Sequence, residues 1–177
     1  MTDKFLKLRA SAINRFILDS SKTIIQDLSL HLKKNSKVSE HLKIDIDNLP
    51  KEKRIKIVFI VAHTLLYNAQ RFFWENIIQN EEYGLRFESF LYKEFAEISG
   101  VDPTPYINDY LKYVKRIGDS GEIQYVGSKI CEEVDIKDAF LMMDICIVYS
   151  AFLTHGFYQG LKGIWDMSDK EIEENLK

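Results

Sequence analysis

The chain has 177 residues, of which 46% are hydrophobic and 29% are charged, and its formal net charge is −3 at pH 7. These values are typical of a globular protein that buries one core, so we expect a single domain over residues 1–177. No basic block stands out along the sequence, which excludes nucleic acid as a main partner.

The cysteines and the N-terminal residues indicate a cytoplasmic chain. Cys131 and Cys146 do not have the spacing of a zinc or redox motif. The first residues, Met1 to Phe5, are charged and lack the apolar region of a signal peptide. We therefore expect a reduced protein in the cytoplasm.

The first third of the chain predicts one helix and one polar connection. Apolar side chains recur at steps of three and four over residues 4–33, which predicts a long amphipathic helix. Residues 34–50 are polar and end in Asn48-Leu49-Pro50, which is typical of a connection. A calcium loop is excluded there, because Pro50 and Lys56 stand where its glycine and its bidentate glutamate belong.

Residues 51–80 predict a central helix that carries unusual polar side chains. From Ile57 to Tyr67 the segment is apolar on nearly every side, which indicates burial. Since buried polar groups need partners, its polar residues face water, one another or a site. They form two neighbouring rows, Thr64, Asn68, Arg71 and Glu75 in one and His63, Tyr67, Gln70 and Trp74 in the other.

Shorter helices are expected in the middle of the chain. Residues 82–99 predict a helix that ends at Gly100. Thr104 is expected to cap a short helix that begins at Pro105 and ends at Gly118, and residues 123–134 predict a further helix of a few turns.

The last long helix is predicted over residues 136–165, with Asp135 or Asp138 as its N-cap. Its apolar part, residues 139–161, is long enough to span a bilayer, but polar side chains such as Asp144 interrupt it. We therefore expect a buried core helix and no membrane contact.

Two further features belong to the end of the chain. Gly156, Gly160 and Gly163 lie near one face, which suggests that a backbone or a ligand approaches closely. Ser168 and Glu171 predict a capping box that opens a C-terminal turn. No strand pattern appears, so we predict an all-α fold, an antiparallel four-helix bundle with extra short helices.

Two histidines and a glutamine are candidate metal ligands. His155 and Gln159 are four residues apart and share one face of the last helix, and His63 lies in the other long apolar segment. Three protein ligands that leave a position open are typical of a catalytic metal site. We expect Zn, Ni or Fe at His63, His155 and Gln159. On spacing alone, two unrelated core histidines are the favoured alternative.

The run His155-Gly156-Phe157-Tyr158-Gln159 resembles the signature helix of the DinB-like superfamily of four-helix metalloproteins, which includes bacterial thiol S-transferases. Members typically carry His-Gly-x-Tyr/His-His there, and a third histidine on the second helix precedes an aromatic-rich stretch. Here that helix has His63, followed by Arg71-Phe72-Phe73-Trp74. Gln159 departs from the pattern, because it replaces the second histidine of the pair.

The resemblance implies a metal-dependent transferase or hydrolase that acts on a small molecule. The metal would lower the pKa of a bound low-molecular-weight thiol or water, and the anion would attack an electrophile. The alternative is a degenerate, non-catalytic helical bundle that serves as a small-ligand-binding regulator or a dimerisation module. Gln159 and the glycines favour this alternative. In both cases we expect a small-molecule ligand, and we expect a homodimer.

Overall fold

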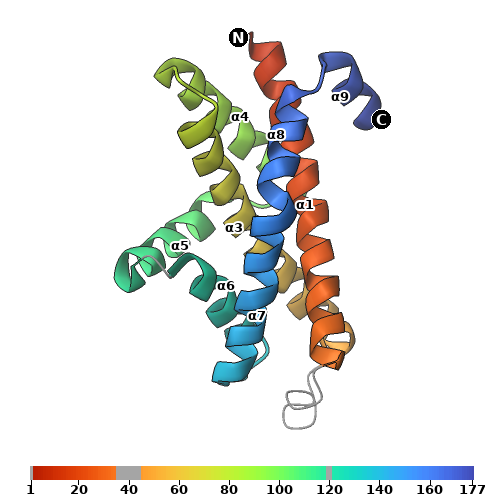
Figure 1. The fold of residues 1–177 in the computed structure, drawn as a ribbon, viewed down its shortest axis with the longest axis vertical. Coiled ribbons are helices and arrows are strands. Elements are labelled where there is room, and N and C mark those ends of the chain that lie inside the picture. Colours follow the sequence, from red (N-terminus) through yellow and green to blue (C-terminus); the bar gives the residue numbers. More distant parts are fainter. Residues whose placement is uncertain (1, 35–44, 119–120) are drawn as a thin grey trace.

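The computed structural model describes residues 2–34, 45–118 and 121–177, and every regular element in these ranges is helical (Figure 1). The all-α prediction is therefore confirmed. In chain order the elements are α1 (Asp3–Lys34), the 3-10 helix η1 (Ile46–Asn48), α3 (Lys51–Asn76), α4 (Glu81–Ser99), α5 (Thr104–Ile117), α6 (Gly121–Glu133), α7 (Ala139–Phe152), the π-helical turn η2 (Leu153–Phe157), α8 (Tyr158–Asp166) and α9 (Asp169–Asn175).

Most helix ends lie where local capping chemistry places them. Asp138 accepts a hydrogen bond from the Leu141 N–H at 2.9 Å, and Ser168 forms the predicted capping box with Glu171. Gly100 adopts φ 73°, the left-handed conformation that ends a helix with little strain. The cap expected at Thr104 is wrong, because the Asp102 carboxylate accepts from the Thr104 N–H instead.

The predicted second helix is four residues too long. It ends at Asn76, and Asn80 caps the next helix by accepting a hydrogen bond from the Tyr83 N–H at 3.1 Å. An N-cap residue has a non-helical backbone, so this bond separates α3 from α4.

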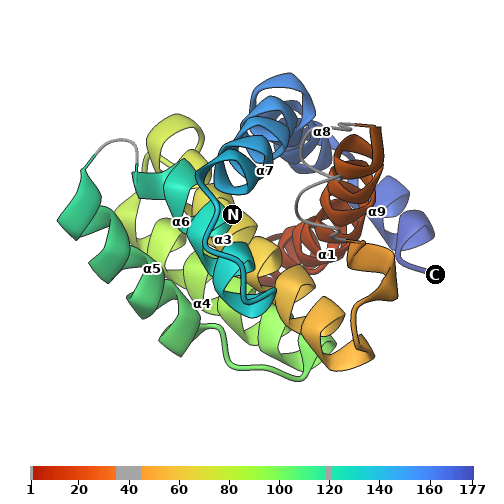
Figure 2. The ribbon, with the colours of Figure 1, turned by 90° about the horizontal axis from the view of Figure 1, so that it is seen from below.

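The long helices pack in both orientations around α1 (Figures 1 and 2). α1 runs antiparallel to α7 and α8, since Phe5 contacts Trp165 and Phe16 stacks on Phe157. It runs parallel to α4, since Asp3 pairs with Arg86 and, further along both helices, the Asn14 side chain donates to the Leu91 carbonyl at 2.8 Å. A regular antiparallel four-helix bundle is therefore not confirmed. The pair α5 and α6 lies beside α3, away from α1 (Figure 2).

α7 is buried on one face only. Leu141, Ile145 and Tyr149 are in the core, whereas Phe140 is 68% exposed and Met143 and Ile147 are about half exposed. The stretch Ala139–Asp166 is long and apolar enough to cross a membrane by length and composition, and 28% of its most apolar window is buried. The core-helix prediction thus holds for one face of α7. The cytoplasmic location and the homodimer stay predictions.

Asp144 is the acid that interrupts this apolar segment, and its position explains why it is tolerated. It is 6% exposed and faces the His31 ring of α1, with 3.5 Å between Oδ1 and Nε2. Burying a carboxylate costs free energy unless another polar group lies close enough to interact with it. Asp144 therefore serves the packing of α7 against α1.

Only one of the three glycines predicted to allow close approach does so. A Cβ at Gly160 would lie 2.5 Å from the Phe16 ring, whereas Gly156 and Gly163 face open space. The closest backbone approach lies elsewhere, at Gly127 of α6. A Cβ there would lie 2.8 Å from Cys146 Sγ and 2.9 Å from the Met142 carbonyl oxygen of α7.

We expect Gly127→Ala to lower the free energy of unfolding by about 1–2 kcal/mol, because overpacking at a backbone contact forces α6 away from α7. Gly163→Ala is the matched control. It adds the same methyl group in open space, so we expect it to raise stability by up to about 1 kcal/mol. Urea denaturation of both variants measures the difference, and equal effects of the two substitutions would contradict the close-approach explanation.

Candidate functional site

His63 lies in an aromatic pocket formed by α3, α4 and α5. It is 3% exposed and stacks on Tyr106 with 4.1 Å between ring centroids. Phe95 also packs against the ring, with 5.2 Å between centroids, and the Nδ1 of His63 is hydrogen-bonded to the Phe59 carbonyl oxygen at 2.6 Å. Burial lowers the pKa of His63 to about 4, so the ring is neutral at pH 7.

His155 and Gln159 are exposed, on η2 and α8 respectively. Next to Gln159, Tyr158 stacks on Phe72 of α3 with 5.4 Å between centroids. Phe72 is nine positions after His63, which is about 13 Å along a helix axis. His63 also faces α4 and α5, whereas η2 and α8 pack against α1 and the C-terminal half of α3.

The structure therefore does not bring the three predicted metal ligands together. Within residues 2–34, 45–118 and 121–177, no group of three His, Cys, Asp or Glu side chains is placed to hold a metal ion. The divalent metal and the low-molecular-weight thiol stay predictions from the resemblance, and we propose no chemistry through either.

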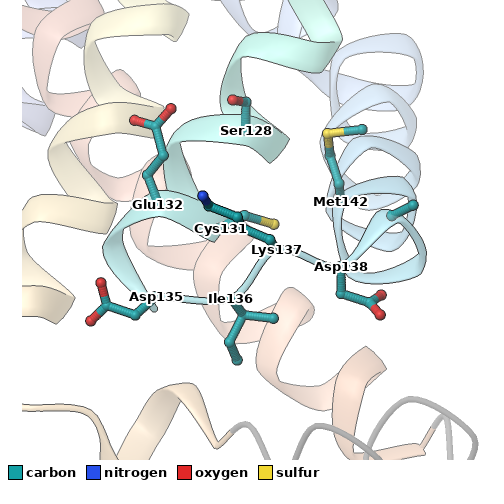
Figure 3. A pocket seen from close by; sticks show the side chains of 9 residues that line it. Ser128, Cys131, Glu132, Asp135, Ile136, Lys137, Asp138 and Met142 are labelled. Carbon is teal, nitrogen blue, oxygen red and sulfur yellow. The ribbon is translucent and has the colours of Figure 1, made fainter.

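A cavity of about 770 Å³ lies at the connection from α6 to α7 (Figure 3). Its acids do not converge, since Glu132 and Asp135 lie on one side and Asp138 on the other. Each has a structural partner: Glu132 pairs with Lys129, Asp135 pairs with Lys53, and Asp138 caps α7. Burial raises the pKa of the Cys131 thiol to about 11, so it is protonated at neutral pH and a poor nucleophile.

A second cavity, of about 410 Å³, has a more specific arrangement of polar groups. It opens between α3, α6 and α8. The Arg71 guanidinium lies between two carboxylates, Glu75 at 2.7 Å and Glu122 of α6, with which it also forms an ion pair. Phe72 and Tyr158 form a stacked aromatic pair beside them. We call this cavity the Arg71 pocket; it is lined by Asn68, Arg71, Phe72, Glu75, Asn76, Glu122 and Tyr158.

Buried polar groups continue from the pocket into the core. Asn68 is 3% exposed and donates hydrogen bonds to the Thr64 carbonyl and to the Tyr149 hydroxyl. The Tyr110 hydroxyl is buried, and it has no hydrogen-bond partner among the described residues. An unpaired buried hydroxyl costs about 1–3 kcal/mol, so a molecule that reached it would relieve this cost.

The electrostatics of the pocket centre on Glu122. Burial raises the pKa of the Tyr110, Tyr149 and Tyr158 hydroxyls, and the nearby charge of Glu122 adds to the increase. These hydroxyls are therefore protonated at neutral pH. Hydrogen bonding to Glu75 and the charge of Glu122 raise the pKa of Arg71. One guanidinium and two carboxylates leave the mouth of the pocket with one negative charge.

The sequence singled out three of the seven residues that line this pocket, although it left open whether they face water, one another or a site. Asn68, Arg71 and Glu75 belong to the polar row predicted on the second helix, and the structure places all three at the pocket. Glu122 was missed, because one acid in the first turn of a helix looks like ordinary stabilisation of the helix dipole. Tyr158, which belongs to the run that resembles the DinB-like signature helix, packs on Phe72 and also lines the pocket.

Comparison of the chain with family models, with curated proteins and with solved structures found no match. The resemblance to the DinB-like superfamily thus stays a prediction.

Proposed function

We propose that this protein is a non-catalytic ligand-binding protein and that it takes a small organic cation in the Arg71 pocket. The observation that carries the proposal is the placement of two carboxylates, Glu75 and Glu122, around a single guanidinium beside a stacked aromatic pair. The excess carboxylate favours a cation, and the side chains of Phe72 and Tyr158 offer π faces that attract one.

The surroundings fit a ligand with an ammonium head and an apolar body. A cavity of about 410 Å³ is within the size range of small-molecule sites. Asn68 and Asn76 supply amide oxygens that accept hydrogen bonds from an N–H donor. No nucleophile with a general base beside it lines this pocket among the described residues, which favours binding over catalysis.

Isothermal titration calorimetry with phenethylamine and benzyltrimethylammonium tests the proposal, with phenylpropionate as an anion of similar size. We expect the two cations to bind and the anion not to bind. Glu122→Gln removes the excess charge and should weaken cation binding about tenfold, as expected for the loss of one charge-assisted contact. Glu97→Gln is the matched control, because it breaks an exposed pair with Lys93 on α4, outside the pocket.

Arg71→Gln distinguishes a cation site from an anion site. It frees both carboxylates of their cation, so we expect phenethylamine to bind about threefold to tenfold more tightly. A site for anions would lose affinity on the same substitution. Binding of phenylpropionate in the wild-type protein, with loss of that binding in Arg71→Gln, would contradict the proposal.

A further inference from the structure

A groove of about 530 Å³ lies at the N-terminal half of α3, between α1, η1 and the end of α4. It shares no lining residue with the Arg71 pocket. Ile55 and Ile98 line it and leave 44% and 41% of their surfaces exposed. The apolar side chains of the groove are Leu18, Ile25, Ile46, Ile55, Val58, Phe59 and Ile98.

Covering such apolar surface with an alkyl chain is favourable, since each CH₂ group removed from water contributes to binding. A continuous apolar groove with a polar rim is also what distinguishes a binding site from scattered exposed hydrophobic residues. The groove therefore fits an apolar chain, and the rim decides which head group accompanies it.

The rim of the groove is predominantly basic. Lys22, Lys51 and Arg54 line it, and Asp47 is its acid. The Asp47 carboxylate accepts hydrogen bonds from Lys33 at 2.6 Å and from the Ser29 hydroxyl at 2.9 Å. The positive charge of Arg54 lowers the pKa of Asp47 less than Lys33 does.

Two of the three rim cations lack an ion-pair partner within residues 2–34, 45–118 and 121–177. Lys51 and Arg54 form no ion pair with any residue in the described parts of the chain, whereas Lys22 pairs with Asp19 at the surface. The rim also lies at the N-terminal, positive end of the α3 dipole, which no side chain caps and which Glu52 in the first turn partly offsets. An anionic head group is thus the one that the rim complements.

We propose that this groove binds a fatty-acid-type carboxylate, with its alkyl chain along Ile55, Phe59 and Ile98 and its carboxylate at Lys51 and Arg54. The apolar lining excludes a purely polar anion as the ligand, because such an anion has no apolar surface to bury in the groove. The positive rim excludes a cationic amphiphile, because it repels the cationic head group. The site is independent of the Arg71 pocket, so its occupancy does not require that pocket to bind anything.

Calorimetric titration with octanoate, decanoate, dodecanoate and tetradecanoate, each below its micellar concentration, tests the apolar part. We expect affinity to increase about fourfold for each added CH₂ until the groove is filled. Dodecanol and dodecyltrimethylammonium, which have the same chain length, should bind more weakly than dodecanoate. Equal affinity across chain lengths, or tightest binding of the ammonium, would overturn the proposal.

The variant Lys51→Gln/Arg54→Gln tests the basic part. We expect it to weaken dodecanoate binding about tenfold and to leave dodecanol binding unchanged, since two exposed charge pairs are lost. Lys53→Gln is the matched control on the same turn, because Lys53 is engaged by Asp135 at 2.7 Å and does not line the groove. If Lys53→Gln and the double variant weakened dodecanoate binding equally, the effect would be one of general charge, and binding of the carboxylate at Lys51 and Arg54 would be refuted.

A membrane surface offers the same chemistry as a free fatty acid, and vesicles separate the two. Cosedimentation with vesicles of phosphatidylcholine and phosphatidylglycerol, combined with no calorimetric signal for dodecanoate, would refute the free carboxylate as the ligand. Saturable binding of dodecanoate at a stoichiometry of one, competed by tetradecanoate, would support it.

Discussion

Arg9→Ala is expected to lower the free energy of unfolding by about 3 kcal/mol, because it removes a buried charge that has several partners at once. Arg9 is 3% exposed and lies under the C-terminal segment. Its guanidinium donates to the carbonyl oxygens of Trp165 and Met167, pairs with Asp169 and stacks on Phe5 at 3.7 Å. The ion pair with Asp169 links α9 to α1 and the two carbonyl contacts hold the segment that leads into α9, so the substitution should also loosen α9.

Urea denaturation and protease sensitivity near α9 measure the two effects. Lys4→Ala is the matched control, since Lys4 pairs with Glu173 of the same helix but is exposed. Exposed pairs contribute little, so we expect the free energy of unfolding of Lys4→Ala to stay close to that of the wild type. Arg9→Lys keeps the positive charge but lacks the planar guanidinium, so its free energy of unfolding should lie between those of Arg9→Ala and Lys4→Ala. An Arg9→Ala protein as stable as Lys4→Ala would refute the role given to Arg9.

The stability of the protein is expected to fall as the pH is lowered from about 6.5 to about 4, because His63 must take up a proton that its pocket disfavours. The pKa of His63 is about 4 in the folded protein and 6.5 in its ordinary state. Between these values the unfolded chain binds more protons, so stability increases with pH. The free energy of unfolding therefore has its full value, as far as His63 is concerned, above pH 6.5. It is lower by on the order of 3 kcal/mol once the pH has fallen to about 4.

His63→Phe isolates this contribution. Phenylalanine keeps an aromatic ring against Tyr106 and Phe95 but does not titrate. We expect the unfolding free energy of this variant, measured in urea at pH 4.5 and pH 7, to depend on pH much less than that of the wild type. A variant His63→Phe with the full wild-type pH dependence would refute the assignment to His63.

Helix positions could be predicted because their signals are local. The periodicity of apolar residues and the caps at Gly100, Asp138 and Ser168 act within a few residues of the chain. The polar row of Asn68, Arg71 and Glu75 was visible for the same reason, since residues three and four apart share a helix face.

The π-helical turn was not predicted, although its cause is in the sequence. Buried residues on α7, η2 and α8 recur every four positions, at Leu141, Ile145, Tyr149, Leu153, Phe157 and Leu161. An α-helix turns about 40° too far at each such step, so the buried row drifts away from the core. A wider turn at Leu153–Phe157 returns Phe157 to Phe16 of α1 and places His155 outside.

By itself the sequence determined that the protein is helical, where most helices begin and end, and which face of α3 carries polar groups. The tertiary structure alone decided that His63 and His155 lie apart, that Glu122 joins Arg71, and that Lys51 and Arg54 border an apolar groove. The physical reason is the distance along the chain over which each kind of interaction acts. Backbone hydrogen bonds and caps are set by neighbours along the chain, whereas which side chains meet depends on how whole helices rotate and cross.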